Sequence, residues 1–350
     1  MKRGTTKTLR VGCILLVTLF LFSAFVLLPQ PARAQTVTAT VTGLNRPYGV
    51  AVTPNGANAY VTNFGGGYSV NTGTVSVIST ATNTVTANIT VGSAPEWVAV
   101  TPNGAYVYVA DWGNAWVSVI STATNTVTAT VTVGPFPQRV AVTPNGEYAY
   151  VTNEGSSSVS VINTATNNVT ETITSLNDPV GVAVTPNSEY AYITNDGMDS
   201  VAVINTATNN VTGTIDVGTS PLGVAVTPNG EYACVTNGYS GSVSVINTAT
   251  KTVTTTISVG SEPNGVAITP NGEYAYVANY GSGSVSVVAL TSSPTAVPTA
   301  KPTVVPTPTI PEFPGQLLAI MLVVFMIIVL SAVISARKRI SWKIQLDPHS

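Results

Sequence analysis

The stretch Val140–Asn153 reads Val-Ala-Val-Thr-Pro-Asn-Gly-Glu-Tyr-Ala-Tyr-Val-Thr-Asn, and near copies of it occur six times along the chain. The shared Thr-Pro-Asn triplet places a proline at positions 54, 102, 144, 186, 228 and 270, so the copies lie 48 and then 42 residues apart. A fixed period in this range is typical of a repeat architecture. The repeat therefore has to be interpreted before any single motif.

One copy of the repeat predicts four short strands. They cover Val140–Val142, Tyr148–Thr152, Val159–Ile162 and Val169–Thr174, where β-branched and aromatic residues dominate. In the Thr-Pro-Asn-Gly turn, proline presets φ and Gly146 takes the positive φ that a hairpin needs. Four antiparallel strands in about 42 residues predict one blade of a β-propeller, with a stacked solenoid as the alternative.

The two ends of the chain favour a ring. The last copy, Gly265–Leu290, contains strands one to three only, while Thr36–Thr42 repeats the fourth-strand sequence of Thr126–Thr132. A ring gains from this permutation because the N-terminal strand can complete the last blade and leave no unpaired edge. We therefore predict an all-β, six-bladed β-propeller of four-stranded blades, in which the N-terminal strand closes the last blade.

The segments outside the repeats predict export and membrane attachment. Residues 1–34 resemble a signal peptide cleaved between Ala34 and Gln35, with an uncleaved anchor as the alternative. The propeller covers 35–290, and a Pro/Thr-rich stalk follows at 291–316. Residues 317–336 are apolar or small and long enough for a transmembrane helix, and the basic tail 337–350 should stay cytoplasmic. The propeller is thus expected outside the cell.

Charge and composition restrict the chemistry. Residues 36–290 hold thirteen acidic and three basic side chains, a net charge of −10, which argues against binding to nucleic acid. Cys234 replaces a tyrosine of the other copies and is expected to be buried. The only histidine, His349, lies in the tail, so the propeller lacks the commonest general base. Asp196 and Asp199 could offer calcium oxygens but lack further ligands, and we expect neither a metal nor a cofactor.

The second strand of each copy carries a recognisable tetrapeptide. Tyr60–Asn63 and Tyr150–Asn153 read Tyr-Val-Thr-Asn, and close variants occur at Tyr108–Asp111 and Tyr276–Asn279. These copies resemble the YVTN family of β-propeller repeats, and the resemblance covers residues 36–290. It implies an archaeal surface-layer or cell-surface protein. Propellers of that family often have seven blades, so six is a departure.

A second resemblance concerns the C-terminal region. The residues Pro311, Glu312, Phe313 and Pro314 precede the predicted membrane helix and a basic cluster. This order is similar to the PEF-type sorting signal of archaeal surface proteins, which implies cleavage by an archaeosortase and transfer to a lipid. Plain membrane anchoring by the helix is the alternative.

One face of the predicted ring varies from copy to copy. The Thr-Pro-Asn-Gly and Asn-Thr-Ala-Thr-Asn turns are nearly constant and share one face, whereas the connections on the other face gather aromatic and charged residues. Loops on a rigid scaffold commonly carry function, although loops also drift without one. The predicted ligand-binding residues are Arg46, Tyr48, Phe64, Tyr68, Glu96, Trp97, Trp112, Trp116, Phe136, Arg139, Asp178, Asp196, Tyr239, Glu262 and Tyr280. Trp97 and Trp112 are expected to rim the same channel mouth.

Three sequons, at Asn88, Asn168 and Asn210, fall in predicted fourth strands, the outermost strands of the blades. They are candidates for glycosylation, but a chain so rich in Asn and Thr also forms sequons by chance.

Two functions from different classes fit these observations. The first is a non-catalytic cell-surface propeller, structural or adhesive, which binds glycans or protein partners through the variable face. The alternative is a propeller enzyme of lactonase-like or quinoprotein-like type, because a fold alone does not fix a function. The missing histidine and inner strands that read mainly Gly-Val-Ala-Val favour the first function.

Overall fold

The computed structural model describes residues 39–65 and 72–290 of the chain. Within these two ranges, no helix is long and apolar enough to cross a membrane. Several predictions fall outside the described residues: the signal peptide with Ala34 and Gln35, the stalk, the Pro311–Pro314 motif, the helix at 317–336, the basic tail, and Tyr68.

The described residues form six antiparallel sheets, one for each copy of the repeat. Five sheets have four strands in chain order, and the sixth has three. The strands are β1 (Pro47–Val52), β2 (Asn58–Asn63), β3 (Gly73–Ser79), β4 (Thr84–Val91), β5 (Pro95–Val100), β6 (Tyr106–Asp111), β7 (Trp116–Ser121), β8 (Thr126–Thr132), β9 (Pro137–Val142), β10 (Tyr148–Asn153), β11 (Ser158–Asn163), β12 (Asn168–Ile173), β13 (Pro179–Val184), β14 (Tyr190–Asn195), β15 (Ser200–Asn205), β16 (Asn210–Asp216), β17 (Pro221–Val226), β18 (Tyr232–Asn237), β19 (Ser242–Asn247), β20 (Thr252–Ser258), β21 (Pro263–Ile268), β22 (Tyr274–Asn279) and β23 (Ser284–Ala289). Two short 3-10 helices, η1 (Glu154–Ser156) and η2 (Asp196–Met198), follow β10 and β14.

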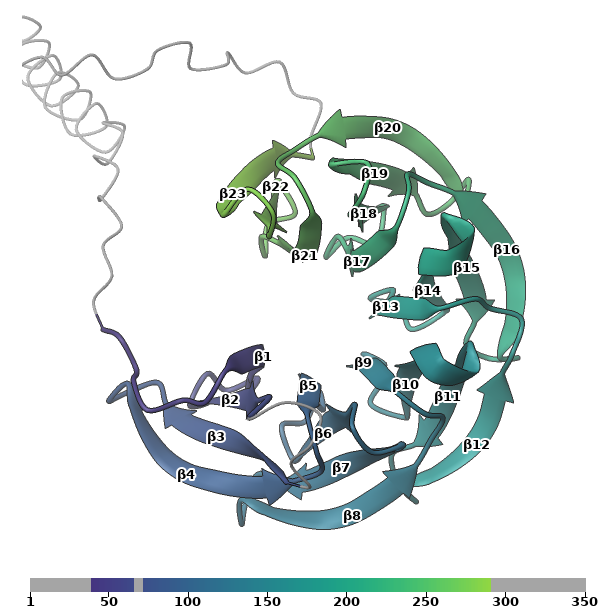
Figure 1. Ribbon diagram of the computed structural model, residues 1–350. Helices are drawn as coiled ribbons and strands as arrows, with labels where there is room; N and C mark the ends of the chain where they lie inside the picture. Colours follow the sequence, from purple (N-terminus) through teal and green to yellow (C-terminus); the bar gives the residue numbers. More distant parts are fainter. Residues whose placement is uncertain (1–38, 66–71, 291–350) are drawn as a thin grey trace, which may run out of the picture. The chain divides into compact units, whose positions relative to one another are not determined.

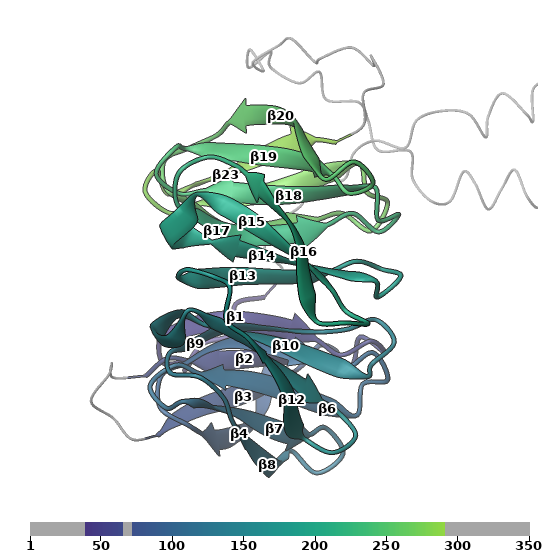
Figure 2. The same ribbon diagram turned by 90° about the vertical axis from the view of Figure 1, so that its right-hand side faces the viewer.

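The sheets are placed in chain order around a common centre, which confirms a propeller-like, all-β fold (Figure 1). The first strand of each sheet lies nearest the centre and the fourth lies at the rim, and Figure 2 shows the sheets from the side as successive layers. The first sheet (β1–β4) and the sixth (β21–β23) are the two ends of this arrangement. The six copies predicted from the sequence therefore correspond to six sheets.

The turns follow the predicted chemistry. In the third sheet, Gly146 has φ +76°, and the Oγ1 of Thr143 donates to Oδ1 of Asn145 at 2.6 Å. Asn167, which ends the second turn, has φ +54°, a conformation that Asn tolerates better than most residues. The strand β9 begins at Pro137, three residues earlier than predicted, because proline is accepted as the first residue of a strand.

Neighbouring sheets pack through a tyrosine in the middle of the second strand. Tyr60, Tyr108, Tyr150 and Tyr192 are fully buried between sheets. The hydroxyl of Tyr150, for example, donates to Oδ1 of Asn209 in the next sheet at 2.7 Å. Cys234 takes this place in the fifth sheet and is buried as predicted, and burial raises the pKa of its thiol to about 12. The repeated apolar residues thus form one continuous series of interfaces.

The predicted closure by an N-terminal strand is wrong in this structure. The described part of the segment, residues 39–42, forms no strand, and the sixth sheet contains β21, β22 and β23 only. Val41 is half-buried, whereas its counterpart Val131 in β8 is buried against the neighbouring sheet. The identical sequence at Thr126–Thr132 forms β8, so the difference lies in the surroundings: Val131 packs against the third sheet, whereas no sheet follows the sixth among the described residues.

The third residue of each innermost strand decides how close the next sheet can come. It is glycine in four sheets, at Gly49, Gly181, Gly223 and Gly265. A Cβ added to Gly223 would collide with the carbonyl oxygen of Asn264 in the following sheet, and Gly49 and Gly181 meet their next sheets in the same way. At Gly265, the nearest atom to an added Cβ is the Cβ of Ala278 at 4.0 Å. At Gly49, Gly181 and Gly223 the following sheet therefore leaves no room for a side chain.

This arrangement gives a prediction with its own control. Replacing Gly223→Ala should destabilise the propeller by roughly 1–3 kcal/mol, because the added methyl forces the backbone of β21 to move. Gly265→Ala adds the same methyl at the same repeat position, where the space is open, and should leave the melting temperature nearly unchanged. Thermal unfolding of both variants checks the interface. Equal melting temperatures for the two would contradict the close approach at Gly223.

Candidate active site

In two sheets, a large side chain replaces the glycine found at one position of the innermost strand in the other four sheets. The third residue of the innermost strand is Trp97 in β5 and Arg139 in β9, in two successive sheets. The residue just before this position varies most along the ring. It is Tyr48, Glu96, Gln138, Val180, Leu222 and Asn264 in sheets one to six. The centre of the propeller thus carries a polar and aromatic cluster contributed mainly by the first three sheets and by Asn264.

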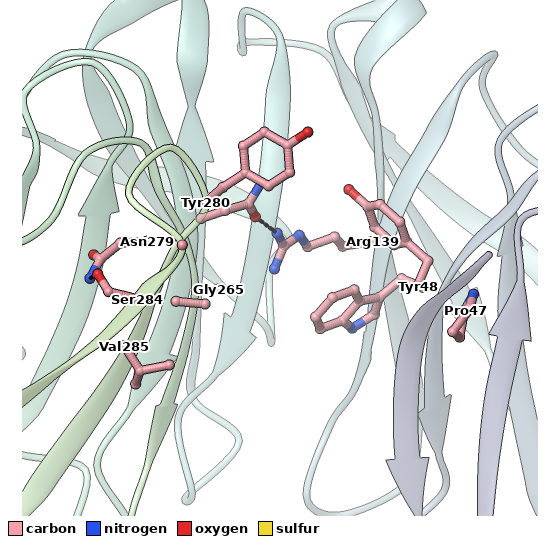
Figure 3. Close-up of a pocket in the computed structure, with 12 residues that line it drawn as sticks. Pro47, Tyr48, Arg139, Gly265, Asn279, Tyr280, Ser284 and Val285 are labelled. Carbon is pink, nitrogen blue, oxygen red and sulfur yellow. Dashed lines mark hydrogen bonds between the residues drawn. The ribbon is translucent and has the colours of Figure 1, made fainter. Parts of the chain in front are cut away.

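Four of these residues, Tyr48, Trp97, Arg139 and Asn264, line a cavity of about 860 Å³ that extends between the first and sixth sheets. Its lining residues are Pro47, Tyr48, Trp97, Arg139, Asn264, Gly265, Ala278, Asn279, Tyr280, Gly283, Ser284 and Val285. Figure 3 shows Arg139 reaching across the cavity toward the sheet that carries Gly265, Tyr280 and Val285, with Tyr48 on the opposite side. The volume is that of pockets that bind small molecules.

Arg139 is held by contacts on two sides. Its guanidinium carbon lies 4.3 Å from the ring centre of Trp97, a cation–π contact. Its Nη2 donates to Oδ1 of Asn264 at 2.8 Å, which links the third sheet to the sixth. The backbone carbonyl of Asn264 is in turn fixed by Oγ1 of Thr236 at 2.8 Å. Burial lowers the pKa of Arg139, but a guanidinium stays charged at any physiological pH.

Glu96 is the titratable partner of this arginine. Its backbone carbonyl accepts from Oγ1 of Thr62 at 2.8 Å, so the first sheet fixes its position. Burial raises the pKa of Glu96 to about 8, a shift that the charge of Arg139 opposes and that of Glu154 reinforces. Glu154 accepts a hydrogen bond from Nε2 of Gln138. At pH 7 the Glu96 carboxyl is mostly protonated, so it does not neutralise the buried guanidinium.

The structure brings together only part of the predicted face. Tyr48, Trp97, Arg139 and Tyr280 line the cavity, and Glu96 adjoins it through its charge interaction with Arg139. Asn264, which is not in the predicted set, also lines the cavity, and Gln138, likewise absent from the set, precedes Arg139 and donates to Glu154. The signal that could have found them is their repeat position, which they share with Tyr48 and Glu96.

The remaining predicted residues lie elsewhere on the loops. Arg46 lies over the ring of Phe64, 5.4 Å from its centre. Trp112 stacks on Phe136 with ring centres 4.6 Å apart, instead of joining Trp97 at one channel mouth. This departure follows from strand position, since Trp97 belongs to an innermost strand and Trp112 to the loop after a second strand.

Four other predicted residues lie in loops of the fourth, fifth and sixth sheets, where the backbone N–H of Asp196 donates to the carbonyl of Asp178 at 3.0 Å. Asp178, Tyr239 and Glu262 are exposed, and Asp196 opens the helix η2. Trp116 points into its own sheet, where its indole N–H donates to the carboxylate of Asp111. Burial raises the pKa of Asp111 to about 7, against the hydrogen bonds from Ser118. None of these residues lines the cavity, although the carbonyl of Glu262 accepts from the backbone N–H of Tyr280, which does.

Two smaller sequence predictions can be placed. The sequon residues Asn88, Asn168 and Asn210 are exposed and belong to the fourth strands β4, β12 and β16, as expected; their glycosylation stays a prediction. Oδ1 of Asp199 accepts from the backbone N–H of Ser220 at 2.9 Å, a structural role in the loop. Within residues 39–65 and 72–290, no group of three or more His, Cys, Asp and Glu side chains is arranged to hold a metal ion.

The fold and its central cavity define a β-propeller with a small-molecule pocket. Residues 124–256 match a family described as "Lactonase, 7-bladed beta-propeller". The match covers the end of the second sheet and the following three, and the family description counts seven blades where the structure has six sheets. No curated protein matches the chain.

Solved structures share the fold at low identity. A putative 6-phosphogluconolactonase from Bacteroides uniformis is 18% identical, with a TM-score of 0.62 and coverage of 71% of this chain and 82% of that one. A putative 6-phosphogluconolactonase from Bacteroides fragilis is also 18% identical, with a TM-score of 0.61 and coverage of 70% and 80%. The periplasmic gluconolactonase of Pseudomonas aeruginosa is 17% identical, with a TM-score of 0.61 and coverage of 71% and 82%.

These findings correct the functional prediction. The expectation of a non-catalytic, structural or adhesive protein is wrong, because the lactonase family match points to an enzyme-like propeller. The prediction gave too much weight to the missing histidine. A buried carboxyl with a raised pKa can act as an acid or base in its place.

Proposed function

We propose that the protein is a lactonase-type hydrolase that opens a cyclic ester in the central cavity. The observation that carries the proposal is the pairing of Arg139 and Trp97, at the repeat position occupied by glycine in the other four sheets, with the half-buried Glu96 beside them. The other four sheets form with glycine at this position, so the fold as such does not require a tryptophan or an arginine there.

Arg139 suits the charge that develops during ester hydrolysis. Attack of water on the lactone carbonyl creates an oxyanion, and ring opening leaves a carboxylate. A fixed, desolvated guanidinium stabilises both, and such preorganised donors commonly contribute the largest share of catalysis. The hydrogen bond to Asn264 and the contact with Trp97 hold the guanidinium in place before substrate binds.

Glu96 suits the role of general base. With a pKa of about 8 it is a stronger base than an ordinary carboxylate, and about one tenth of it is ionised at pH 7. The ionised form accepts a proton from the attacking water. The protonated form then donates to the ring oxygen as it leaves, so one group serves both steps.

The substrate class follows from the cavity and from the related proteins. The names of the similar structures refer to a gluconolactone, either phosphorylated or not. The test is hydrolysis of a panel of five- and six-membered lactones by the purified chain, followed as proton release at constant pH. Release above the uncatalysed rate supports the proposal, and its absence for every lactone overturns it.

We further propose that the enzyme acts outside the cell. The predicted signal peptide at 1–34, the stalk at 291–316 and the apolar segment at 317–336 support this location, as do the repeats that resemble the YVTN family. The net charge of −10 in residues 36–290 fits a soluble, exposed domain.

Mass spectrometry of the protein from its native cells tests this location. We expect a mature N-terminus at Gln35 and recovery in the membrane fraction. Loss of the peptide Ile340–Ser350 would indicate removal of the helix by a sortase, and its presence would indicate a retained anchor. An intact Met1 on protein from the soluble cell extract would contradict export.

A further inference from the structure

The cavity has two chemically different ends. Arg139 and Asn264 form a polar end with hydrogen-bonding groups, and the face of Trp97 lies beneath the guanidinium. The wall formed by the sixth sheet has an apolar part, Ala278 and Val285, beside the polar pair Asn279 and Ser284, in which Nδ2 of Asn279 donates to Oγ of Ser284 at 3.1 Å. Pro47 and Tyr48 lie on the opposite side of the cavity (Figure 3). A ligand that fills the whole cavity therefore meets a cation at one end and hydrocarbon along its side.

In the sixth sheet, the face that contacts a following sheet elsewhere in the propeller is exposed. Val285 is 61% exposed, whereas its counterparts Val75, Val117, Val159, Val201 and Val243 are fully buried by the next sheet. Ala278 is exposed, although the same position is fully buried in the other five sheets. Gly265 also faces open space, in contrast with Gly223. The surface that joins one sheet to the next elsewhere is thus part of the cavity wall here.

The polar end sets the chemistry of the head group. Arg139 carries a buried positive charge, and Glu96 is mostly protonated at neutral pH, so the charge is not cancelled within the site. A carboxylate, or the carbonyl of a lactone, supplies the oxygen atoms that a guanidinium binds best. A ligand with such a head and an apolar tail satisfies both ends of the cavity at once.

We propose that this cavity is specific for lactones and hydroxy acids that carry an unbranched alkyl or acyl substituent. The oxygen-rich head binds at Arg139 and Asn264, and the tail lies along Ala278 and Val285. This inference rests on the proposed lactonase function for its reaction, but the binding preference itself is independent of turnover. It predicts a different substrate from the compact sugar lactones.

Calorimetric titration of the full chain with acetate, hexanoate and decanoate, below micelle-forming concentrations, tests the tail directly. None of the three is a lactone, so the result does not depend on catalysis. Transfer of methylene groups from water to the wall should raise the affinity by up to about fourfold for each carbon added. Equal affinities for acetate and decanoate would overturn the proposal.

Two valine variants locate the tail. Val285→Thr keeps the shape of the side chain but makes the wall polar, and should reduce the gain in affinity with each added carbon. Val287→Thr is the matched control, because Val287 is similarly exposed on the same strand but does not line the cavity. Arg139→Gln should weaken all three probes by a similar factor. If Val285→Thr and Val287→Thr give the same affinities as the unaltered chain, the tail does not lie on this wall and the proposal is wrong.

If the carboxylates bind with the expected dependence on length but no lactone is hydrolysed, the proposed function fails while the amphiphile site stands. If lactones are hydrolysed at rates independent of tail length and decanoate binds no better than acetate, the function stands and this inference fails.

Discussion

Replacing Glu96→Gln should lower kcat for lactone hydrolysis by about 10²–10⁴-fold, the usual contribution of a general acid or base. Burial raises the pKa of Glu96 to about 8. As the base it must be ionised, so kcat/KM of the unaltered enzyme should rise nearly tenfold per pH unit below pH 8 and level off above it. The residual activity of the variant should lack this rise. Initial rates between pH 6 and 9 check both statements.

Glu273→Gln is the matched control, because this carboxyl lies at a constant turn, where it accepts from Nδ2 of Asn271. It should leave rates and pH profile unchanged.

Stability gives a readout that is independent of activity. Since the pKa of Glu96 in the folded state exceeds its ordinary value of 4.5, the folded chain binds more protons between pH 4.5 and about 8. Glu96 therefore makes the free energy of unfolding fall as pH rises through this range, and Glu96→Gln should remove that part of the fall. A variant that keeps the full pH profile would show that another group is the base.

Restoring glycine at both exceptional positions, with Trp97→Gly and Arg139→Gly together, should abolish measurable hydrolysis. The change removes the guanidinium and the surface beneath it, and the two inner strands then resemble those of the first, fourth and fifth sheets. Each new glycine costs about 0.5–1 kcal/mol in chain entropy, and loss of the packing of Trp97 against the neighbouring core adds to this cost, so the melting temperature should fall. Circular dichroism and rate measurements on the same preparation separate loss of fold from loss of activity.

Trp112→Gly serves as the control, because Trp112 stacks on Phe136 in a loop and does not line the cavity. It should retain hydrolysis within a few-fold of the unaltered enzyme. If the double glycine variant stays folded and active, the site lies elsewhere in the protein. If Trp112→Gly is as inactive as the double variant, the rim rather than the cavity carries the reaction.

The sequence predicts the blades well because their determinants are local. Each turn depends on residues such as Pro144 and Gly146, and each interface depends on a tyrosine or cysteine of the same strand, so the six copies can be interpreted one at a time. Closure of the ring is different. It depends on how much surface Thr36–Thr42 buries on a distant edge, and sequence identity to Thr126–Thr132 does not establish that.

The sequence predicts only part of the candidate site, for a related reason. Divergence among copies identified Trp97 and Arg139, but it also selected Trp112, Asp178 and Tyr239, which lie on separate connections. Distance from the centre distinguishes the two groups, and it follows from strand order within a blade. The raised pKa of Glu96 results from burial among neighbouring sheets, which no local pattern reveals.

The most direct test of the account is the rate of proton release by the purified chain with six-membered lactones at pH 8. We predict ring opening above the uncatalysed rate for the unaltered enzyme and none for the double variant of Trp97 and Arg139. Rates equal to the uncatalysed reaction for every lactone between pH 6 and 9, from a chain shown to be folded, would contradict the account.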